Sequence, residues 1–205
     1  TFSAALAAGL VAEGLSVDVV RCGPPPPMED APLEDAMVLA SLDPLDGRGS
    51  DAALAVLNAS DVAIIQHEYG LYDGRDGVSI LALMARLTVP TMVVAHTVVG
   101  DPSASQRYIL GEVCRMADVV VVMTDTARDR LIAGFDVEAG KVVVIPHGAA
   151  TPLANPAFSS QRPNPATPRL LTWGLLGPGK GIEWAIDSLD AVADLRPHPE
   201  YIVAG

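Results

Sequence analysis

Short apolar runs rich in β-branched residues alternate along the chain with longer segments of helical pattern. An almost continuous apolar run is typical of a strand buried on both faces, as in a parallel sheet covered by helices. The runs predict strands at 17–20, 62–65, 91–95, 119–123, 142–145, 170–173 and 202–204. Helical patterns predict helices at 2–13, 51–58, 78–87, 104–116, 125–133 and 182–195, and a Gly or Pro follows the first, third, fifth and sixth of these segments.

This alternation of strand and helix predicts an α/β protein with a Rossmann-like, doubly wound parallel sheet. Five prolines between Ala149 and Pro168 interrupt the pattern and indicate a linker, with a long surface loop inside one domain as the alternative. We expect an N-terminal Rossmann-like domain over 1–157 and a linker over 158–169. The first β-α-β unit of a second Rossmann-like domain would follow over 170–205.

Composition narrows the function classes. The 205 residues carry 25 Asp and Glu against 13 Lys and Arg, a net charge of -12, so a nucleic-acid partner is not expected. No apolar stretch reaches the length of about 20 residues that spans a membrane. Cys22 and Cys114 lie far apart in the sequence, which favours a reduced, cytoplasmic protein over a disulfide-linked one.

Three of the four histidines follow predicted strands, where ligands bind in open parallel sheets. His67, with Glu68 and Tyr69, predicts a polar binding loop, and the alternative is a structural hydrogen-bonded pair. His96 follows a wholly apolar strand and is expected to face the cleft, or else to be a buried histidine with its own partners. His147 has either a hinge or packing role, together with Gly148, or a ligand contact.

Two further features concern helix capping and metals. Thr124 and Asp125 follow a strand and precede a helical segment, so we interpret Thr124 and Asp125 as a helix N-cap, and the alternative is a ligand contact. The histidines show no i, i+4 or HxH spacing, and no metal ligand is predicted.

A glycine-rich stretch lies between the predicted strand at 170–173 and the last helix. It matches the phosphate-loop pattern G-x-x-x-x-G-K, but Gly181 stands where a Ser or Thr would hold Mg²⁺. Glycine N–H groups, a helix start and one lysine together favour an anion. The predicted diphosphate ligands are Gly174, Gly179, Lys180 and Gly181, and the alternative is a glycine-rich turn with a solvated lysine.

Taken in order, these motifs resemble a family-4 glycosyltransferase of the GT-B type. The matching segments are 66–70 (QHEYG), 96–97 (HT), 117–118 (AD), 141–148 (KVVVIPHG) and 174–183 (GLLGPGKGIE). The resemblance implies two Rossmann-like domains facing across a cleft and a chain truncated at both ends, inactive alone.

The implied reaction moves a hexose-type sugar from a nucleoside-diphosphate sugar to an acceptor hydroxyl, with retention and without a metal or other cofactor. The acceptor would be a saccharide, a lipid-linked glycan or a small molecule, and the resemblance is compatible with peripheral membrane contact.

The resemblance also implies roles for single residues. Lys180 would neutralise the donor diphosphate between flanking glycines. His96 would reach the transferred sugar or the acceptor as the catalytic residue, and His67, Glu68 and Tyr69 would hold the acceptor. Leu175 and His147 depart from the family's usual Arg and Asn, and the family's Glu-x7-Glu motif is not in this chain.

Three other functions stay open. A noncatalytic nucleotide- or sugar-binding module and a nucleotide-sugar epimerase share this fold. A phosphate-loop nucleotidase fits less well, because it needs a downstream strand that ends in Asp, and the last predicted strand ends at Ala204.

Overall fold

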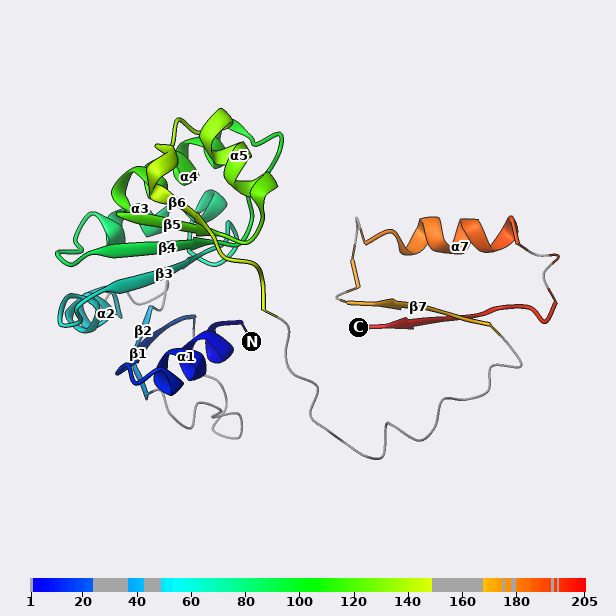
Figure 1. The fold of residues 1–205 in the computed structure, drawn as a ribbon, viewed down its shortest axis with the longest axis horizontal. Helices are drawn as coiled ribbons and strands as arrows, with labels where there is room; N and C mark the ends of the chain where they lie inside the picture. The colour runs from blue at the N-terminus through cyan, green and yellow to red at the C-terminus, as the bar shows by residue number, and fades with distance from the viewer. Residues whose placement is uncertain are drawn as a thin grey trace. The chain divides into compact units, whose positions relative to one another are not determined.

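The computed structural model describes residues 2–23, 37–42, 49–148, 168–174, 176–177, 180–192, 194 and 196–205. The chain divides into two compact units, residues 1–148 and 149–205 (Figure 1). The expected linker at 158–169 lies almost wholly outside the described residues, so the predicted limits at 157 and 170 stay a prediction.

Four parallel strands form the main sheet of the first unit. They are β3 (Ala63–His67), β4 (Thr91–Ala95), β5 (Val119–Val122) and β6 (Val142–Val144), and they lie in this order across the sheet. Neighbouring strands are consecutive in the chain, so each pair needs a crossover connection, which helices supply. The predicted Rossmann-like α/β fold with a parallel sheet is confirmed.

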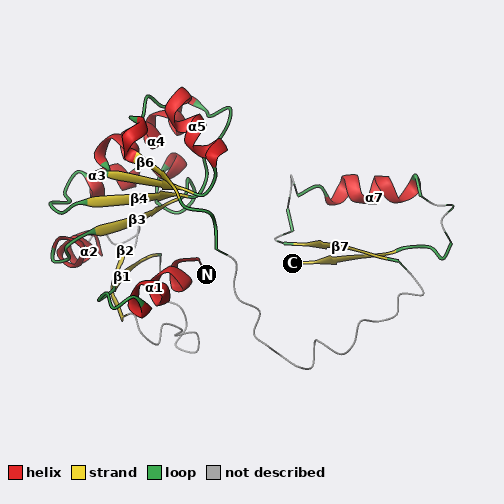
Figure 2. Cartoon of the chain, viewed as in Figure 1, coloured by secondary structure: helices red, strands yellow, loops and turns green. Residues whose placement is uncertain are grey.

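Helices supply the crossovers and cover the sheet (Figure 2). Thr124 accepts a hydrogen bond from the Ala127 N–H and caps its helix, as predicted, and Ser103 forms a capping box with Gln106. The apolar faces of the helices pack against the strands in one core, which includes Ile80, Ile109, Leu110, Val93 and Val120. The helices are α2 (Gly49–Asn58), α3 (Ser79–Met84), α4 (Ala104–Met116) and α5 (Asp125–Gly134), with short 3₁₀ turns η1 (Arg75–Gly77) and η2 (Ala139–Lys141).

The N-terminal part of the first unit holds α1 (Phe2–Ala12) and a parallel pair, β1 (Asp18–Cys22) and β2 (Met37–Leu42). The apolar pattern did not predict β2, because its Met, Leu and Ala residues favour helix as much as strand. The next strand was predicted to end at 65, whereas β3 continues to His67. This extension decides which way the polar side chains after Ile65 point.

The second unit contains one parallel β-α-β arrangement, as expected. Its elements are β7 (Arg169–Trp173), α7 (Ile182–Asp190) and β8 (Glu200–Ala204), and β7 pairs with β8 along its whole length. The helix ends at Asp190, earlier than the predicted 195.

Two predicted absences concern membranes and metals. Among the described residues, no helix is both long and apolar enough to cross a bilayer. Within the same ranges, no three His, Cys, Asp or Glu side chains gather closely enough to hold a metal ion. The cytoplasmic location and the metal-free reaction stay predictions.

Candidate functional site

The carboxyl ends of β3 and β4 bring together the polar side chains that follow these two strands. The two strands pair in register, with His67 opposite Ala95. The His96 N–H donates to the His67 carbonyl oxygen at 3.1 Å, which ties the chain after β4 to the end of β3. This edge is where parallel sheets bind ligands.

His96 is half-buried at this edge and has two close neighbours. Its Nε2 lies 2.8 Å from the Gln66 Oε1, and its ring meets the Phe2 ring edge-on with centroids 4.8 Å apart. Burial lowers the pKa of His96 below its ordinary value, the Glu68 carboxylate opposes this shift, and His147 adds to it. His96 therefore presents a neutral imidazole at pH 7, which can both donate and accept a hydrogen bond.

Glu68 uses both carboxylate oxygens within the protein. Oε2 accepts from the Thr97 hydroxyl at 2.6 Å, and Oε1 accepts from the Tyr69 N–H at 3.0 Å. The carboxylate thus holds the residue next to His96 in place and puts a negative charge beside the imidazole.

His67 and Tyr69 point into the core. Their exposed fractions are 1% and 9%, and their rings meet edge-on with centroids 5.3 Å apart. Among the described residues, neither ring nitrogen of His67 nor the Tyr69 hydroxyl has a hydrogen-bond partner. Burial lowers the pKa of His67 to about 4 and raises the pKa of Tyr69 to about 12.

The direction of the His67 side chain follows from the extra length of β3. Side chains alternate along a strand, so Ile65 and His67 share the buried side while Gln66 takes the other. The structure places the Glu68 side chain beside His96 at the carboxyl ends of β3 and β4, which we call the polar edge. The His67 and Tyr69 side chains do not lie at this edge. Acceptor binding by His67, Glu68 and Tyr69 stays a prediction.

His147 and Gly148 lie after β6 and are exposed. The His147 Nδ1 lies 2.7 Å from the Gly148 carbonyl oxygen, and the His147 ring centroid lies 5.2 Å from that of Phe2. Phe2 therefore contacts both His96 and His147, which places these two histidines on one side of the first unit. The predicted hinge role of His147 and Gly148 is untested.

The glycine-rich stretch lies in the second unit. Gly174 and Gly181 have φ angles of 143° and 73°, which only glycine adopts readily. Gly181 caps the start of α7, and the Lys180 side chain is exposed just before it. Gly179 and Leu175 lie outside the described residues. The described part offers a helix start and one cation, the two features expected of a diphosphate site, and the predicted contacts stay a prediction.

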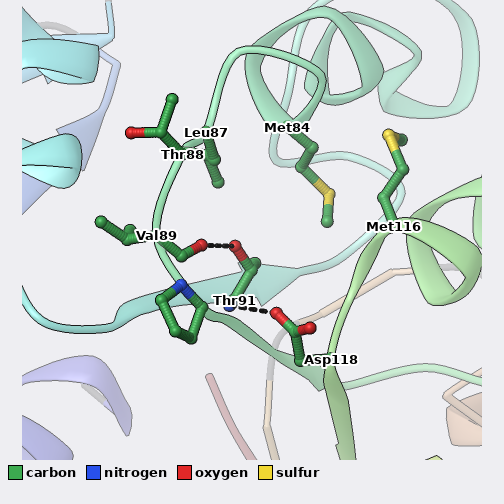
Figure 3. A pocket seen from close by; sticks show the side chains of 8 residues that line it. Met84, Leu87, Thr88, Val89, Thr91, Met116 and Asp118 are labelled. Atoms are coloured by element: carbon green, nitrogen blue, oxygen red, sulfur yellow. Dashed lines mark hydrogen bonds between the residues drawn. The ribbon is translucent and has the colours of Figure 1, made fainter.

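A separate pocket of about 350 Å³ lies at the opposite edge of the sheet, where β4 and β5 begin (Figure 3). The Thr91 N–H donates to the Asp118 Oδ2 at 2.8 Å, and the Thr91 hydroxyl donates to the Val89 carbonyl at 3.1 Å. These bonds satisfy the start of β4, so we interpret Asp118 as structural. The pocket lining also includes Met84, Leu87, Thr88, Pro90 and Met116.

The comparison with protein families identifies the family of this chain. The family described as Glycosyltransferase Family 4 matches residues 1–151 of this chain. The chain belongs to glycosyltransferase family 4. The resemblance drawn from the motifs is thereby confirmed. Among curated protein sequences, none is significantly similar to the chain.

Two solved structures share the fold of this family-4 chain. The Anabaena protein HepE, crystallised with UDP and glucose, is 15% identical with a TM-score of 0.57, over 83% of this chain and 48% of its own. A glycosyltransferase from Rickettsia africae is 11% identical with a TM-score of 0.60, over 100% of this chain and 64% of its own. The chain thus spans less than two thirds of the length of either neighbour.

Three residues at the polar edge were given no role in the sequence analysis: Gln66, Thr97 and Phe2. The alternation of side chains could have revealed Gln66, had the strand been extended through His67. Thr97 directly follows His96 and was noted only as part of a motif. No sequence signal pairs Phe2 with His96, because the two are more than 90 residues apart.

Proposed function

We propose that this chain acts in the transfer of a hexose-type sugar from a nucleoside-diphosphate sugar to an acceptor hydroxyl, with retention and without a metal ion. The observation that carries the proposal is the His96 imidazole, whose Nε2 lies 2.8 Å from the Gln66 Oε1 at the carboxyl edge of a family-4 sheet. The UDP and glucose in the HepE crystal support a nucleotide-sugar donor.

The chemistry divides between the two units. A neutral imidazole at His96 can hydrogen-bond a hydroxyl of the transferred sugar or of the acceptor without adding positive charge near the reacting carbon, where an oxocarbenium-like transition state develops. The diphosphate leaves with growing negative charge, which Lys180 and the N–H groups at the start of α7 can stabilise. We propose that Lys180 supplies the positive charge that a divalent metal supplies in other diphosphate sites.

The acceptor side involves Glu68 and its neighbours. The Glu68 carboxylate is already bonded to Thr97 and Tyr69, so we propose that it acts by fixing the edge and by its charge. We propose no single acceptor among a saccharide, a lipid-linked glycan and a small molecule. Turnover would need a complete nucleotide-sugar domain, and the 205-residue chain would bind ligands without turnover.

Donor binding tests the proposal directly. We would measure the affinity of the 205-residue chain for UDP, GDP and ADP by calorimetry, with and without EDTA. We expect Lys180→Ala to weaken binding about tenfold or more, the loss of one charge-assisted contact. Arg169→Ala is the matched control, because it removes a positive charge at the start of β7, whereas the glycine-rich stretch follows the end of β7. We expect it to leave the affinity for the three nucleotides unchanged.

The results separate the proposal from its rivals. Equal affinity in the Lys180→Ala variant and the parent, or loss of binding in EDTA, would contradict the metal-free diphosphate site. Product analysis on a protein that carries a complete second domain then decides the activity. A glycosyltransferase yields a new glycoside of retained configuration, an epimerase returns an altered donor sugar, and a binding module yields neither.

A further inference from the structure

Gln66 and His96 are held toward each other by independent main-chain contacts. The Gln66 carbonyl oxygen accepts from the Tyr72 hydroxyl at 2.7 Å, besides its place in β3. The His96 N–H donates to the next carbonyl, that of His67, at 3.1 Å. Both backbones are therefore fixed before any ligand arrives, and the 2.8 Å contact between the two side chains joins fixed supports.

The amide oxygen of Gln66 can only accept a hydrogen bond. The His96 Nε2 that faces it must then carry the hydrogen, and in a neutral ring the lone pair is left on Nδ1. Among the described residues, no group donates to this Nδ1. The arrangement leaves one acceptor nitrogen of a neutral imidazole available at the ligand-binding edge of the sheet.

We propose that Gln66 is a positioning residue that fixes His96 as the Nε2–H tautomer, so that Nδ1 accepts a hydrogen bond from a sugar hydroxyl. The sugar as occupant rests on the proposed function, whereas the tautomer rests on the Gln66 contact alone. Without Gln66 the ring would exchange between its two neutral tautomers, and the acceptor would be present for only part of the time.

Other groups around His96 do not fix the tautomer. Phe2 contacts the ring by its edge and offers no polar atom. The Glu68 carboxylate and His147 act on His96 through their charge, and the two Glu68 oxygens are already bonded to Thr97 and Tyr69. Gln66 is the described side chain that hydrogen-bonds the His96 ring.

Imidazole nitrogen spectra of the 205-residue chain test this directly. Long-range ¹H–¹⁵N correlation at pH 7.5 distinguishes Nε2–H from Nδ1–H, and the His96→Asn variant assigns the signal. We expect the Nε2–H form to dominate in the parent. Gln66→Met, which keeps the length and loses the acceptor, should lower the tautomer ratio about fivefold, the value of one ordinary hydrogen bond.

Gln66→Glu is the matched second variant. It keeps an acceptor oxygen, so the Nε2–H form should persist, and its charge should raise the pKa of His96. A mixed tautomer in the parent, or the same ratio in the parent and Gln66→Met, overturns the inference. Calorimetry keeps the proposed function separate: unchanged donor affinity in Lys180→Ala rejects that function, whereas only the nitrogen spectra decide the tautomer.

Discussion

The Thr97 hydroxyl donates to the Glu68 Oε2 at 2.6 Å, and this bond joins the segment after β4 to the segment after β3. The contact between Gln66 and His96 is a second link between the two strands' ends. The neighbouring residues His96 and Thr97 are thus bonded to the side chains of Gln66 and Glu68. The polar edge of the sheet is cross-linked through the side chains of His96 and Thr97. Burial lowers the pKa of His96, and the Glu68 carboxylate at this edge opposes the shift.

Glu68→Gln should lower the pKa of His96 further. The carboxylate raises that pKa against the effect of burial, and an uncharged amide of the same size removes this contribution while keeping an oxygen for Thr97. The imidazole would then stay neutral to a lower pH than in the parent. A titration of the His96 ring signals by NMR between pH 4 and pH 8 measures the shift.

Glu112→Gln is the control for this titration. Glu112 pairs with Arg115 on the exposed side of α4, so its charge should not reach His96. An unchanged or raised pKa in Glu68→Gln, or the same shift in both variants, would refute the electrostatic role of Glu68.

His67 should make the first unit sensitive to acid. The pKa of His67 is about 4 in the folded chain and 6.5 for an ordinary histidine. Between these two values the unfolded state binds more protons than the folded state, so the free energy of unfolding falls as the pH falls. Above pH 6.5 the neutral His67 ring costs the folded state nothing, and at pH 4 the free energy of unfolding is about 3 kcal/mol lower than it is above pH 6.5.

His67→Leu should flatten this acid dependence. Leucine has a similar volume, and among the described residues the His67 ring bonds no group that would lose a partner. Hydrogen exchange of the β4 and β5 amides at several pH values reports the first unit, whereas Trp173 and Trp184, the two tryptophans, report the second. His198→Leu, at an exposed histidine, should leave the slope unchanged. A slope equal to the parent's in His67→Leu would refute the assignment.

The sequence predicted those features that depend on local pattern. The runs before His96 and around Val120 became β4 and β5, because their β-branched residues suit strands covered on both faces. The cap at Thr124 followed from its position between a strand and a helical segment. The parallel order of the strands followed from their alternation with helices.

The rest depended on contacts between distant segments. Whether His67 points to the core or to the cleft depends on the two residues by which β3 continues past Ile65, where the apolar pattern stops. The contact between Phe2 and His96 arises from packing of α1. Nothing in the sequence pattern assigns a role to the Gln66 amide, because its contact with His96 depends on the pairing of β3 with β4.

Variants of Asp118 test whether the edge of the sheet at the start of β4 and β5 has a structural role. Its Oδ2 accepts from the Thr91 N–H, its own N–H donates to the Thr91 carbonyl at 2.9 Å, and Thr91 is 5% exposed. Asp118→Ala would leave a buried N–H without an acceptor, so we expect a loss of about 1–2 kcal/mol in the free energy of unfolding. Asp118→Asn keeps an oxygen there and should lose clearly less. Hydrogen exchange of the β4 amides measures both variants. Equal losses in both would refute the hydrogen-bond explanation, and altered UDP affinity in either variant would refute the structural interpretation of this edge.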